Sequence, residues 1–442
     1  MVTSKLQSTP TRERCRDPLC VRRCYHALLC FFFNRRLATF LAGQQGAESA
    51  TNLPVKWSPD DGGVWTTDLP GHGQSSPIIV DKSIYVTAVD GPMKESNIVI
   101  CVDLLTGKEK WQHKSESSLQ VKNDVYTSRA APTPVADANG VYAFFESGNL
   151  IALDPSGKVR WKRSLFDDYG KYKGRFGLGG SVAQTEDRIF VLADFEGPSY
   201  LLAINKATGE TIWKMDRESR IAWSSPMVIP VNGKPQIIVS SSGWIDGYDP
   251  ATGKQLWTTD EVGGNTIASP SFVSDGMFLI GASPGRNGEN TEGAKQSNML
   301  MKISFADGKY TPTVVWRNKY ATTSFGSPIA HKGHAYYANR AGVLFCIDLE
   351  TGATAYTMRL AESNWATPLG NGDRVYLFGQ LGVTTVVATG KEKNKLAENR
   401  IYKSKGKGGP GGFAGEIQYG VALAQEGLVI RTGERLYLIA AK

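Results

Sequence analysis

The chain has 442 residues, of which 41% are hydrophobic and 48 are glycine, enough for one large packed domain but not for a second catalytic domain beside it. Its formal charge of +8 is concentrated in residues 1–47, which carry eight basic and two acidic side chains. The rest of the chain is close to neutral, which argues against a nucleic-acid partner.

Residues 1–50 form the first predicted segment, a leader. Arg22 and Arg23 precede an apolar run from Ala27 to Phe33, a pattern that resembles a secretory signal. The run is too short to cross a membrane as a stable helix. We therefore expect export to the periplasm or cell envelope, cleavage near residues 47–50, and no stable transmembrane span in the mature chain. A translation start further along, or a disordered tail, remains an alternative.

A repeated pattern runs through the rest of the chain. Its clearest copy is GYDPATGKQLW, from Gly247 to Trp257, and weaker copies each end in an aromatic residue. From Trp65 onward these closing aromatics are 46, 50, 52, 44, 59, 40 and 46 residues apart, a period typical of four-stranded propeller blades. The Thr-Gly pair predicts a turn in which glycine adopts a positive φ at little cost.

Ahead of each copy, a small residue, usually followed by proline, begins the innermost strand. These starts are Ser75, Ala130, Gly179, Ser224, Ala268, Gly326, Ala366 and Tyr419. The eighth unit reaches Lys442 without a fourth strand, and the strand Gly63 to Thr67 is expected to supply it. We therefore predict an all-β, eight-bladed propeller over residues 51–442, closed by its N-terminal strand so that no sheet edge is left open.

The AxDxxTGxxxW pattern and the small-Pro strand starts, over residues 63–442, resemble the pyrroloquinoline quinone (PQQ) repeat family. Two branches of that family are relevant here, the PQQ-dependent alcohol dehydrogenases and the non-catalytic propellers of outer-membrane barrel assembly. The resemblance implies tryptophans that dock neighbouring blades together. In this chain they are Trp65, Trp111, Trp161, Trp213, Trp257 and Trp316.

The lengths of the connections indicate which face is functional. Turns between first and second strands are minimal, whereas all long insertions fall between blades or between second and third strands, which emerge on one face. Side chains expected around the channel mouth on that face are Gln74, Arg129, Arg175, Phe176, Trp223, Asn265, Phe325, Asn364, Trp365, Gln418 and Tyr419. Aromatic and arginine side chains beside a concave opening are typical of binding sites. Trp223 and Trp365 have packing between blades as an alternative role.

The cysteines indicate no disulfide framework. Four of the six lie in the leader, and Cys101 and Cys346 occupy the same position in two repeats that are not neighbours. A bond between these two is geometrically implausible. We expect both to be buried as small hydrophobic side chains.

Catalytic signals are weak. A PQQ dehydrogenase, as the resemblance implies, needs a Ca²⁺ cage, an Asp base, a Trp beneath the cofactor and an adjacent Cys pair. The sequence has no adjacent cysteines, and its nearest carboxylates to the mouth are Asp167, Asp168 and Glu416. His331 and His334 have a spacing found in metal sites but lie on a minimal turn of the opposite face. No cofactor and no metal are expected.

The sequence therefore predicts an exported, monomeric, non-catalytic propeller that binds envelope-associated protein partners through its long-loop face. Two alternatives stay open. One is a quinoprotein oxidoreductase with a diverged site, which a carboxylate cluster in the channel would favour. The other is a carbohydrate-binding accessory protein, which an exposed aromatic platform on the long-loop face would favour.

Overall fold

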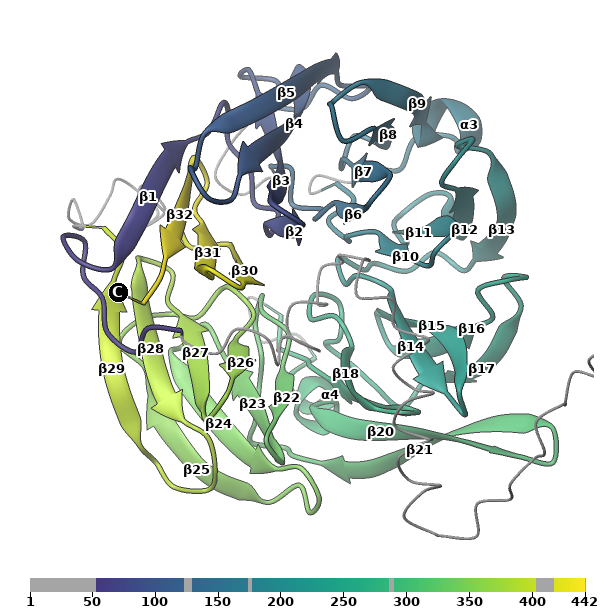
Figure 1. Ribbon diagram of the computed structural model, residues 1–442. Coiled ribbons are helices and arrows are strands. Elements are labelled where there is room, and N and C mark those ends of the chain that lie inside the picture. The colour runs from purple at the N-terminus through teal and green to yellow at the C-terminus, as the bar shows by residue number, and fades with distance from the viewer. Residues whose placement is uncertain (1–52, 123–128, 174–176, 286–289, 403–416, 442) are drawn as a thin grey trace, which may run out of the picture. The chain divides into compact units, whose positions relative to one another are not determined.

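The structure is a computed structural model that describes residues 53–122, 129–173, 177–285, 290–402 and 417–441. The predicted leader lies outside these residues and remains a prediction. Within them the chain forms eight four-stranded antiparallel sheets around a central axis (Figure 1). The predicted eight-bladed β-propeller is thereby confirmed. We number the blades by their inner strands in chain order.

Blades 1 to 4 each run from an inner to an outer strand in sequence order. Their strands are β2 (Ile78–Val80), β3 (Ser83–Asp90), β4 (Ser96–Asp103) and β5 (Glu109–Glu116); β6 (Val135–Asp137), β7 (Gly140–Phe144), β8 (Asn149–Leu153) and β9 (Val159–Ser164); β10 (Ala183–Gln184), β11 (Arg188–Ala193), β12 (Ser199–Asn205) and β13 (Thr211–Arg217); β14 (Met227–Val231), β15 (Lys234–Ser241), β16 (Trp244–Tyr248) and β17 (Gln255–Thr259).

Blades 5 to 7 follow the same order, and blade 8 takes its outer strand from the other end of the chain. Their strands are β18 (Ser271–Ser274), β19 (Met277–Ile280), β20 (Met299–Ala306) and β21 (Lys309–Arg317); β22 (Ile329–His331), β23 (His334–Ala338), β24 (Val343–Asp348) and β25 (Thr354–Arg359); β26 (Leu369–Asn371), β27 (Arg374–Phe378), β28 (Val383–Ala388) and β29 (Lys395–Arg400); β30 (Gly420–Ala424), β31 (Gly427–Arg431), β32 (Arg435–Ile439) and β1 (Gly63–Asp68).

The ring closes as predicted, because β1 pairs antiparallel with β32. The segment before β1 also holds blade 7. The carbonyl of Val55 accepts a hydrogen bond from Asn399 Nδ2 at 2.8 Å, and the N–H of Trp57 donates to Asn399 Oδ1 at 3.0 Å. The Trp57 ring is buried and stacks on Tyr376. The residues before β1 therefore connect blades 7 and 8. These two blades are neighbours in the ring (Figure 1).

A belt of hydroxyl groups links the inner strands and explains the small-Ser/Thr-Pro pattern. Just before six of these eight strands, a backbone N–H donates to the hydroxyl at the same position of the next blade, with N···O distances of 2.8–3.0 Å. In order of donation the residues are Ser76, Thr133, Ser181, Ser225, Ser269, Ser327 and Thr367. Blade 8 has Gly420 there, pressed against Ser76, so the belt is interrupted on either side of blade 8.

Five of the predicted docking tryptophans lie on the Thr-Gly or Ser-Gly turn of the following blade. Each indole covers a glycine of positive φ, and its Nε1 donates to a carbonyl of the same turn at 2.9–3.1 Å. The pairs of tryptophan and glycine are Trp65 and Gly107, Trp111 and Gly157, Trp161 and Gly209, Trp213 and Gly253, and Trp316 and Gly352. A side chain at these glycines would collide with the indole, which is why the turn requires glycine.

Trp257, in the clearest copy of the repeat, departs from this pattern. Its indole folds over Gly247 of its own blade, and Nε1 donates to Gln236 Oε1 at 2.8 Å. The next blade has no Thr-Gly turn to receive it. Instead, the long hairpin of β20 and β21 packs alongside β17 (Figure 1), and Trp257 is buried beside Phe278.

Two of the predicted long connections contain short helices, α3 (Leu165–Tyr169) and α4 (Thr291–Gln296). Ser164 caps α3 by accepting a hydrogen bond from the N–H of Asp167 at 3.3 Å, and the buried ring of Phe166 lies against Gly148. The turns between first and second strands are short, as predicted, for example between Val80 and Ser83. Cys101 and Cys346 are free and buried, also as predicted.

Candidate functional site

The inner strands of the eight sheets face the centre of the ring (Figure 1), so the residues that precede them are the ones to compare with the predicted channel mouth. Nine of the eleven side chains predicted for the channel mouth belong to the described chain. Arg175 and Phe176 lie outside the described residues. Some of the other nine belong to the group of rings described next, and others use polar atoms inside the fold, although Asn364 Oδ1 and Gln418 Oε1 are buried with no partner among the described residues.

Aromatic rings from four successive blades form an arc at the mouth. Phe325 precedes blade 6, Trp365 blade 7, Tyr419 blade 8 and His72 blade 1. The centroids of Phe325 and Trp365 are 4.3 Å apart, those of Trp365 and Tyr419 6.3 Å, and those of Tyr419 and His72 6.0 Å. Phe325 is 43% exposed, and the other three are partly exposed. The arc follows the inner strands, so its geometry is fixed by the ring of blades.

Positive charge lies at one end of this arc. The backbone N–H of Gln74 donates a hydrogen bond to the carbonyl of Arg129 at 3.0 Å, which fixes the Arg129 backbone beside Gln74. Burial, followed by the charges of Arg129 and Arg431, lowers the pKa of His72 to about 3, so the imidazole is neutral at pH 7. Burial raises the pKa of Tyr419, partly offset by a hydrogen bond with Gln74 and by the same two arginines.

Arg431, at the end of β31, is fully buried beneath the arc. Its Nη1 donates to the carbonyl of Ser75 at 3.0 Å and to the Ser75 hydroxyl, and its Nη2 donates to the carbonyl of Thr87 at 2.6 Å. Its Nε is buried with no partner among the described residues. All these acceptors are neutral, and burial lowers the pKa of Arg431 to about 9. A buried guanidinium held only by neutral oxygens is costly.

We call Phe325, Trp365, Tyr419, His72, Arg129 and Arg431 the mouth cluster. Its charged members are both cations. His72 and Arg431 were missed from the sequence, because neither belongs to the small-residue strand starts. The sequence signal for Arg431 was an arginine that ends the apolar strand sequence GLVIR.

Other predicted mouth residues have structural roles. Asn265 is buried and its amide is fully used, donating to Ser240 and to the carbonyls of Ser241 and Trp244, and accepting from Gly243. Asn364 Nδ2 donates to the carbonyl of Ala366 at 2.8 Å, and Gln418 Nε2 to the carbonyl of Gly379 at 2.7 Å.

Trp223 packs between blades, the alternative foreseen for it. Its Nε1 donates to the carbonyl of Gly177 at 3.2 Å, and its ring meets Phe195 edge to face. Because its polar atom and its ring are used in these contacts, Trp223 packs against blade 3 and is not part of the arc.

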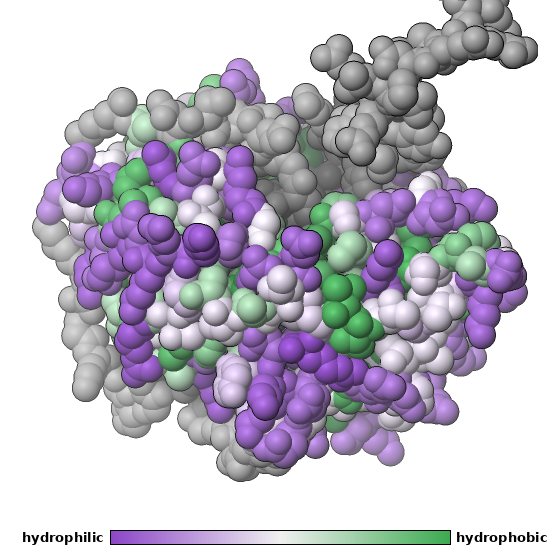
Figure 2. Space-filling view, turned by 90° about the horizontal axis from the view of Figure 1, so that it is seen from below, coloured by the Kyte–Doolittle hydropathy of each residue, from purple (hydrophilic) through white to green (hydrophobic). Residues whose placement is uncertain are grey.

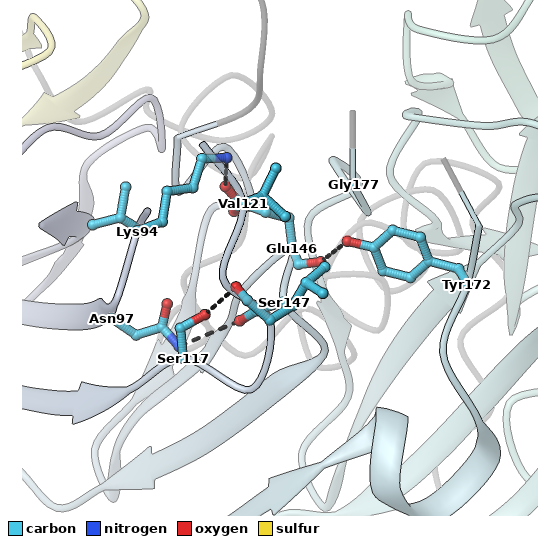
Figure 3. A pocket seen from close by; sticks show the side chains of 10 residues that line it. Lys94, Asn97, Ser117, Val121, Glu146, Ser147, Tyr172 and Gly177 are labelled. Carbon is cyan, nitrogen blue, oxygen red and sulfur yellow. Dashed lines mark hydrogen bonds and ion pairs between the residues drawn. The ribbon is translucent and has the colours of Figure 1, made fainter. Parts of the chain in front are cut away.

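A small cavity of about 20 Å³ lies between blades 1 and 2 on the same face (Figure 3). Lys94 Nζ and Glu146 Oε1 are 3.2 Å apart in it, and both side chains are less than a tenth exposed. Glu146 Oε1 also accepts the N–H of Ala130 at 3.1 Å, and Tyr172 donates to the Glu146 carbonyl. The cavity has room for about one water molecule, so it fixes the loop after β3 to blade 2 and is too small for an organic ligand.

The residues of the mouth do not fit a calcium-bound quinone. Calcium requires several oxygen ligands, mainly carboxylates, yet no group of three or more His, Cys, Asp or Glu among the described residues could hold a metal ion. Asp168 is engaged with Arg163 at 2.6 Å, and Glu416 lies outside the described residues. His331 Nε2 donates a hydrogen bond to the carbonyl of Gly372 at 2.8 Å, between blades 6 and 7 on the opposite face.

The outer rim of the molecule is chemically mixed. Seen from below Figure 1, its surface is mainly hydrophilic with small separate hydrophobic patches (Figure 2). An open groove of about 770 Å³ runs along the rim between blades 5 and 6, lined by Tyr320, which is 70% exposed, and Phe345. In the part of the chain that the structure describes, no helix is long and apolar enough to span a membrane.

Comparison with known sequences gives a consistent result. The model of the family described as outer membrane protein assembly factor BamB matches residues 46–176, 170–355 and 308–396. Outer membrane protein assembly factor BamB of Burkholderia pseudomallei is 25% identical over 223 residues, which are 50% of this chain and 54% of that protein. The factor of Shewanella oneidensis is 24% identical over 246 residues, 54% of this chain and 55% of that protein. The chain thus matches about half the length of these relatives.

Among solved structures, BamB from Moraxella catarrhalis superposes with a TM-score of 0.58 at 12% identity, covering 86% of this chain and 97% of that one. The quinohemoprotein alcohol dehydrogenase of Comamonas testosteroni superposes with a TM-score of 0.57 at 13% identity, covering 90% and 78%. At these identities the likeness concerns the fold alone, and it does not separate a scaffold from an oxidoreductase.

Proposed function

Because the chain belongs to the family of the outer membrane protein assembly factor BamB, we propose that it is an exported, non-catalytic scaffold that binds protein partners of the cell envelope. The binding surface is the face that carries the mouth cluster and the long connections. By analogy with the names of its relatives, the partners belong to outer-membrane protein assembly.

The observation that carries this proposal is the arc of Phe325, Trp365 and Tyr419, held just before the inner strands of a closed ring. Large aromatic rings on a rigid scaffold bind protein surfaces with little loss of side-chain entropy. The donor set argues against quinone-dependent catalysis, because the described residues of the mouth offer arginines where a calcium-quinone centre needs carboxylates.

The proposal is tested by site-specific photo-crosslinking. A photoreactive residue at position 325 of the purified propeller, incubated with an envelope fraction, is expected to give discrete protein adducts that excess unlabelled propeller suppresses. The same probe at Val64, which is 54% exposed on the outer strand β1, is the matched control. Equal adducts at both positions, or none at either, would contradict a binding role for this face.

The quinoprotein alternative is tested separately, by calorimetric titration with PQQ and Ca²⁺ and an alcohol-oxidation assay with a dye acceptor. We expect neither binding nor turnover. Micromolar binding together with turnover would replace the scaffold proposal by an oxidoreductase.

A further inference from the structure

We infer that Glu146 is a positioning residue for the partner-binding face. This one buried residue fixes three of the long connections on that face and, through them, the end of the arc that belongs to blade 1. The inference rests on the proposed scaffold function, because it names the residue on which the shape of the binding face depends.

Three connections from different parts of the chain meet at Glu146, in the turn between β7 and β8 of blade 2 (Figure 3). Lys94, in the connection between β3 and β4, donates from Nζ to Glu146 Oε1 at 3.2 Å. The N–H of Ala130, at the end of the connection from blade 1 to blade 2, donates to the same oxygen at 3.1 Å. The hydroxyl of Tyr172, in the connection from blade 2 to blade 3, donates to the Glu146 carbonyl. Three separate insertions are therefore fixed to a single residue.

Two of these partners have backbone conformations that need support. Lys94 and Ala130 have φ values of 54° and 50°, in the left-handed region that side chains other than Asn and Asp rarely adopt. Such conformations persist where the surrounding contacts hold them. Glu146 Oε1 binds the side chain of one residue and the backbone N–H of the other. Loss of this oxygen should therefore allow both connections to leave their present conformations.

The cavity around Glu146 adjoins the arc. The carbonyl of Ala130 accepts the N–H of Gln74 at 3.3 Å. Val89, which lines the cavity, exchanges two backbone hydrogen bonds with His72, at 2.9 and 3.0 Å. The ring of His72 in turn meets that of Tyr419 edge to face. Displacement of the residues around the cavity should therefore move the His72 end of the arc.

A matched control lies at the other end of β7. Lys206 Nζ and Asp137 Oδ2 are 2.9 Å apart, and their side chains are 5% and 6% exposed. The side chains of Lys94 and Glu146 are 7% and 8% exposed. Both pairs are buried ion pairs between neighbouring blades, and loss of either carboxylate leaves a buried ammonium without its anion. The two losses should lower the melting temperature to a similar degree, but Asp137 ends β6 on the face opposite the long connections.

Hydrogen–deuterium exchange of the full-length protein tests the positioning role in the absence of a partner. Glu146→Leu should speed exchange by about tenfold or more in all three connections and at the His72 end of the arc, since local opening exposes their amides. Asp137→Leu should leave these segments within about twofold of the wild type. The peptides to follow cover residues 72–74, 90–97, 117–121 and 165–173. Faster exchange in residues 90–97 alone, or the same pattern in both variants, would overturn the inference.

A conservative variant gives a graded result. Glu146→Gln keeps an oxygen that can accept the N–H of Ala130 but removes the charge that pairs with Lys94. Exchange should therefore rise in the same segments, by less than in Glu146→Leu. Circular dichroism checks that each variant is folded, and Glu146→Gln decides the question if Glu146→Leu does not fold. Wild-type exchange in folded Glu146→Gln would contradict the role of the carboxylate.

Partner binding is compared with the photoreactive probe at position 325 and an envelope fraction. If the ordered arrangement falls to about a tenth of the molecules, the apparent affinity falls about tenfold. Below saturation, Glu146→Leu should therefore give about tenfold fewer adducts than the wild type, and Asp137→Leu less than about twofold fewer. Equal adducts from all three proteins would overturn this inference while the scaffold function stands. No adducts from the wild-type protein would instead contradict the proposed function itself.

Discussion

Trp213 shows how a single side chain ties two blades together. Its indole lies on Gly253 of the next blade, and its Nε1 donates to the carbonyl of Pro250 at 3.1 Å. We expect Trp213→Ala to lower the free energy of unfolding by about 3–5 kcal/mol, as for other packed aromatic side chains. Trp213→Phe should lose less, since it keeps a ring on the glycine and removes a hydrogen bond of about 1 kcal/mol.

Urea unfolding followed by circular dichroism measures these differences. The control is Ile212→Ala, at the neighbouring position of β13, where the side chain is 40% exposed. It should change stability by less than about 1 kcal/mol. Similar losses for Trp213→Ala and Ile212→Ala would show that the indole does not dock the blades.

His72 makes stability depend on pH. Its folded pKa of about 3 is below the ordinary 6.5, so the unfolded chain binds a proton at this residue between these pH values and the folded chain does not. The free energy of unfolding therefore does not depend on His72 titration above pH 6.5. As the pH drops from 6.5 toward 3, protonation of His72 in the unfolded chain lowers this free energy by up to about 1.4 kcal/mol per pH unit.

The measurement is thermal or urea unfolding at pH 7.5 and pH 5.5, above the range in which most carboxylates titrate. His72→Gln should lose less stability than the wild type between these two values. Identical losses in both proteins would mean that the imidazole is not protected from protonation by burial, Arg129 and Arg431.

For single residues, the sequence predicted the roles of those that belong to the repeat pattern and missed the roles of those outside it. The Thr-Gly turns and their tryptophans share a pattern, so their places followed from it. Asn265 was expected to face a ligand, yet its amide, in the connection before blade 5, bonds to residues of blade 4. Arg431 was missed because its partners, Ser75 and Thr87, are more than 340 residues away along the chain.

The element that completes the ring is β1, together with the segment before it. The carbonyl of Leu53 accepts from Arg374 Nη1 at 2.9 Å, and β1 pairs with β32 from Gly63 to Asp68. Removal of residues 53–68 should leave the edge of β32 unpaired and uncover the apolar cluster around Tyr376. Exposed strand edges and apolar surface promote association.

We therefore expect the truncated protein to melt at a lower temperature and to form oligomers in size-exclusion chromatography with light scattering. Val64→Thr, which changes an exposed side chain of β1, should keep the wild-type elution volume and melting temperature. A monomeric truncated protein with wild-type melting would refute the role of β1 in closure.

The elements themselves were predictable to different degrees. Strand order and closure followed from the repeat, because most blades share the same local turns. The helices α3 and α4 did not, since each is a single insertion with no second copy. Trp257 departs from the expected docking because its partner, the hairpin of β20 and β21, belongs to the next blade and lacks the Thr-Gly turn.

In the whole molecule every blade has two neighbours, because the first and last parts of the chain meet in blade 8. An open array of repeats can fray from its ends, where each terminal unit has only one neighbour. Closure removes such ends, so the contacts between all the blades are expected to form one cooperative unit. The arc at the channel mouth crosses the closure, since Tyr419 belongs to blade 8 and His72 to the start of blade 1, so its geometry depends on the closed ring.

Contacts between blades at two distant places in the ring should therefore be lost in the same unfolding transition. Trp57→Ala weakens the contact of blades 7 and 8, where Trp57 stacks on Tyr376, and Trp213→Ala weakens the contact of blades 3 and 4. Each variant should shift one melting transition that circular dichroism and tryptophan fluorescence report at the same temperature. A separate early transition in Trp57→Ala, absent from Trp213→Ala, would instead mean that blades 7 and 8 open on their own while the rest of the ring stays folded, and the channel mouth would then lose its shape before the protein unfolds.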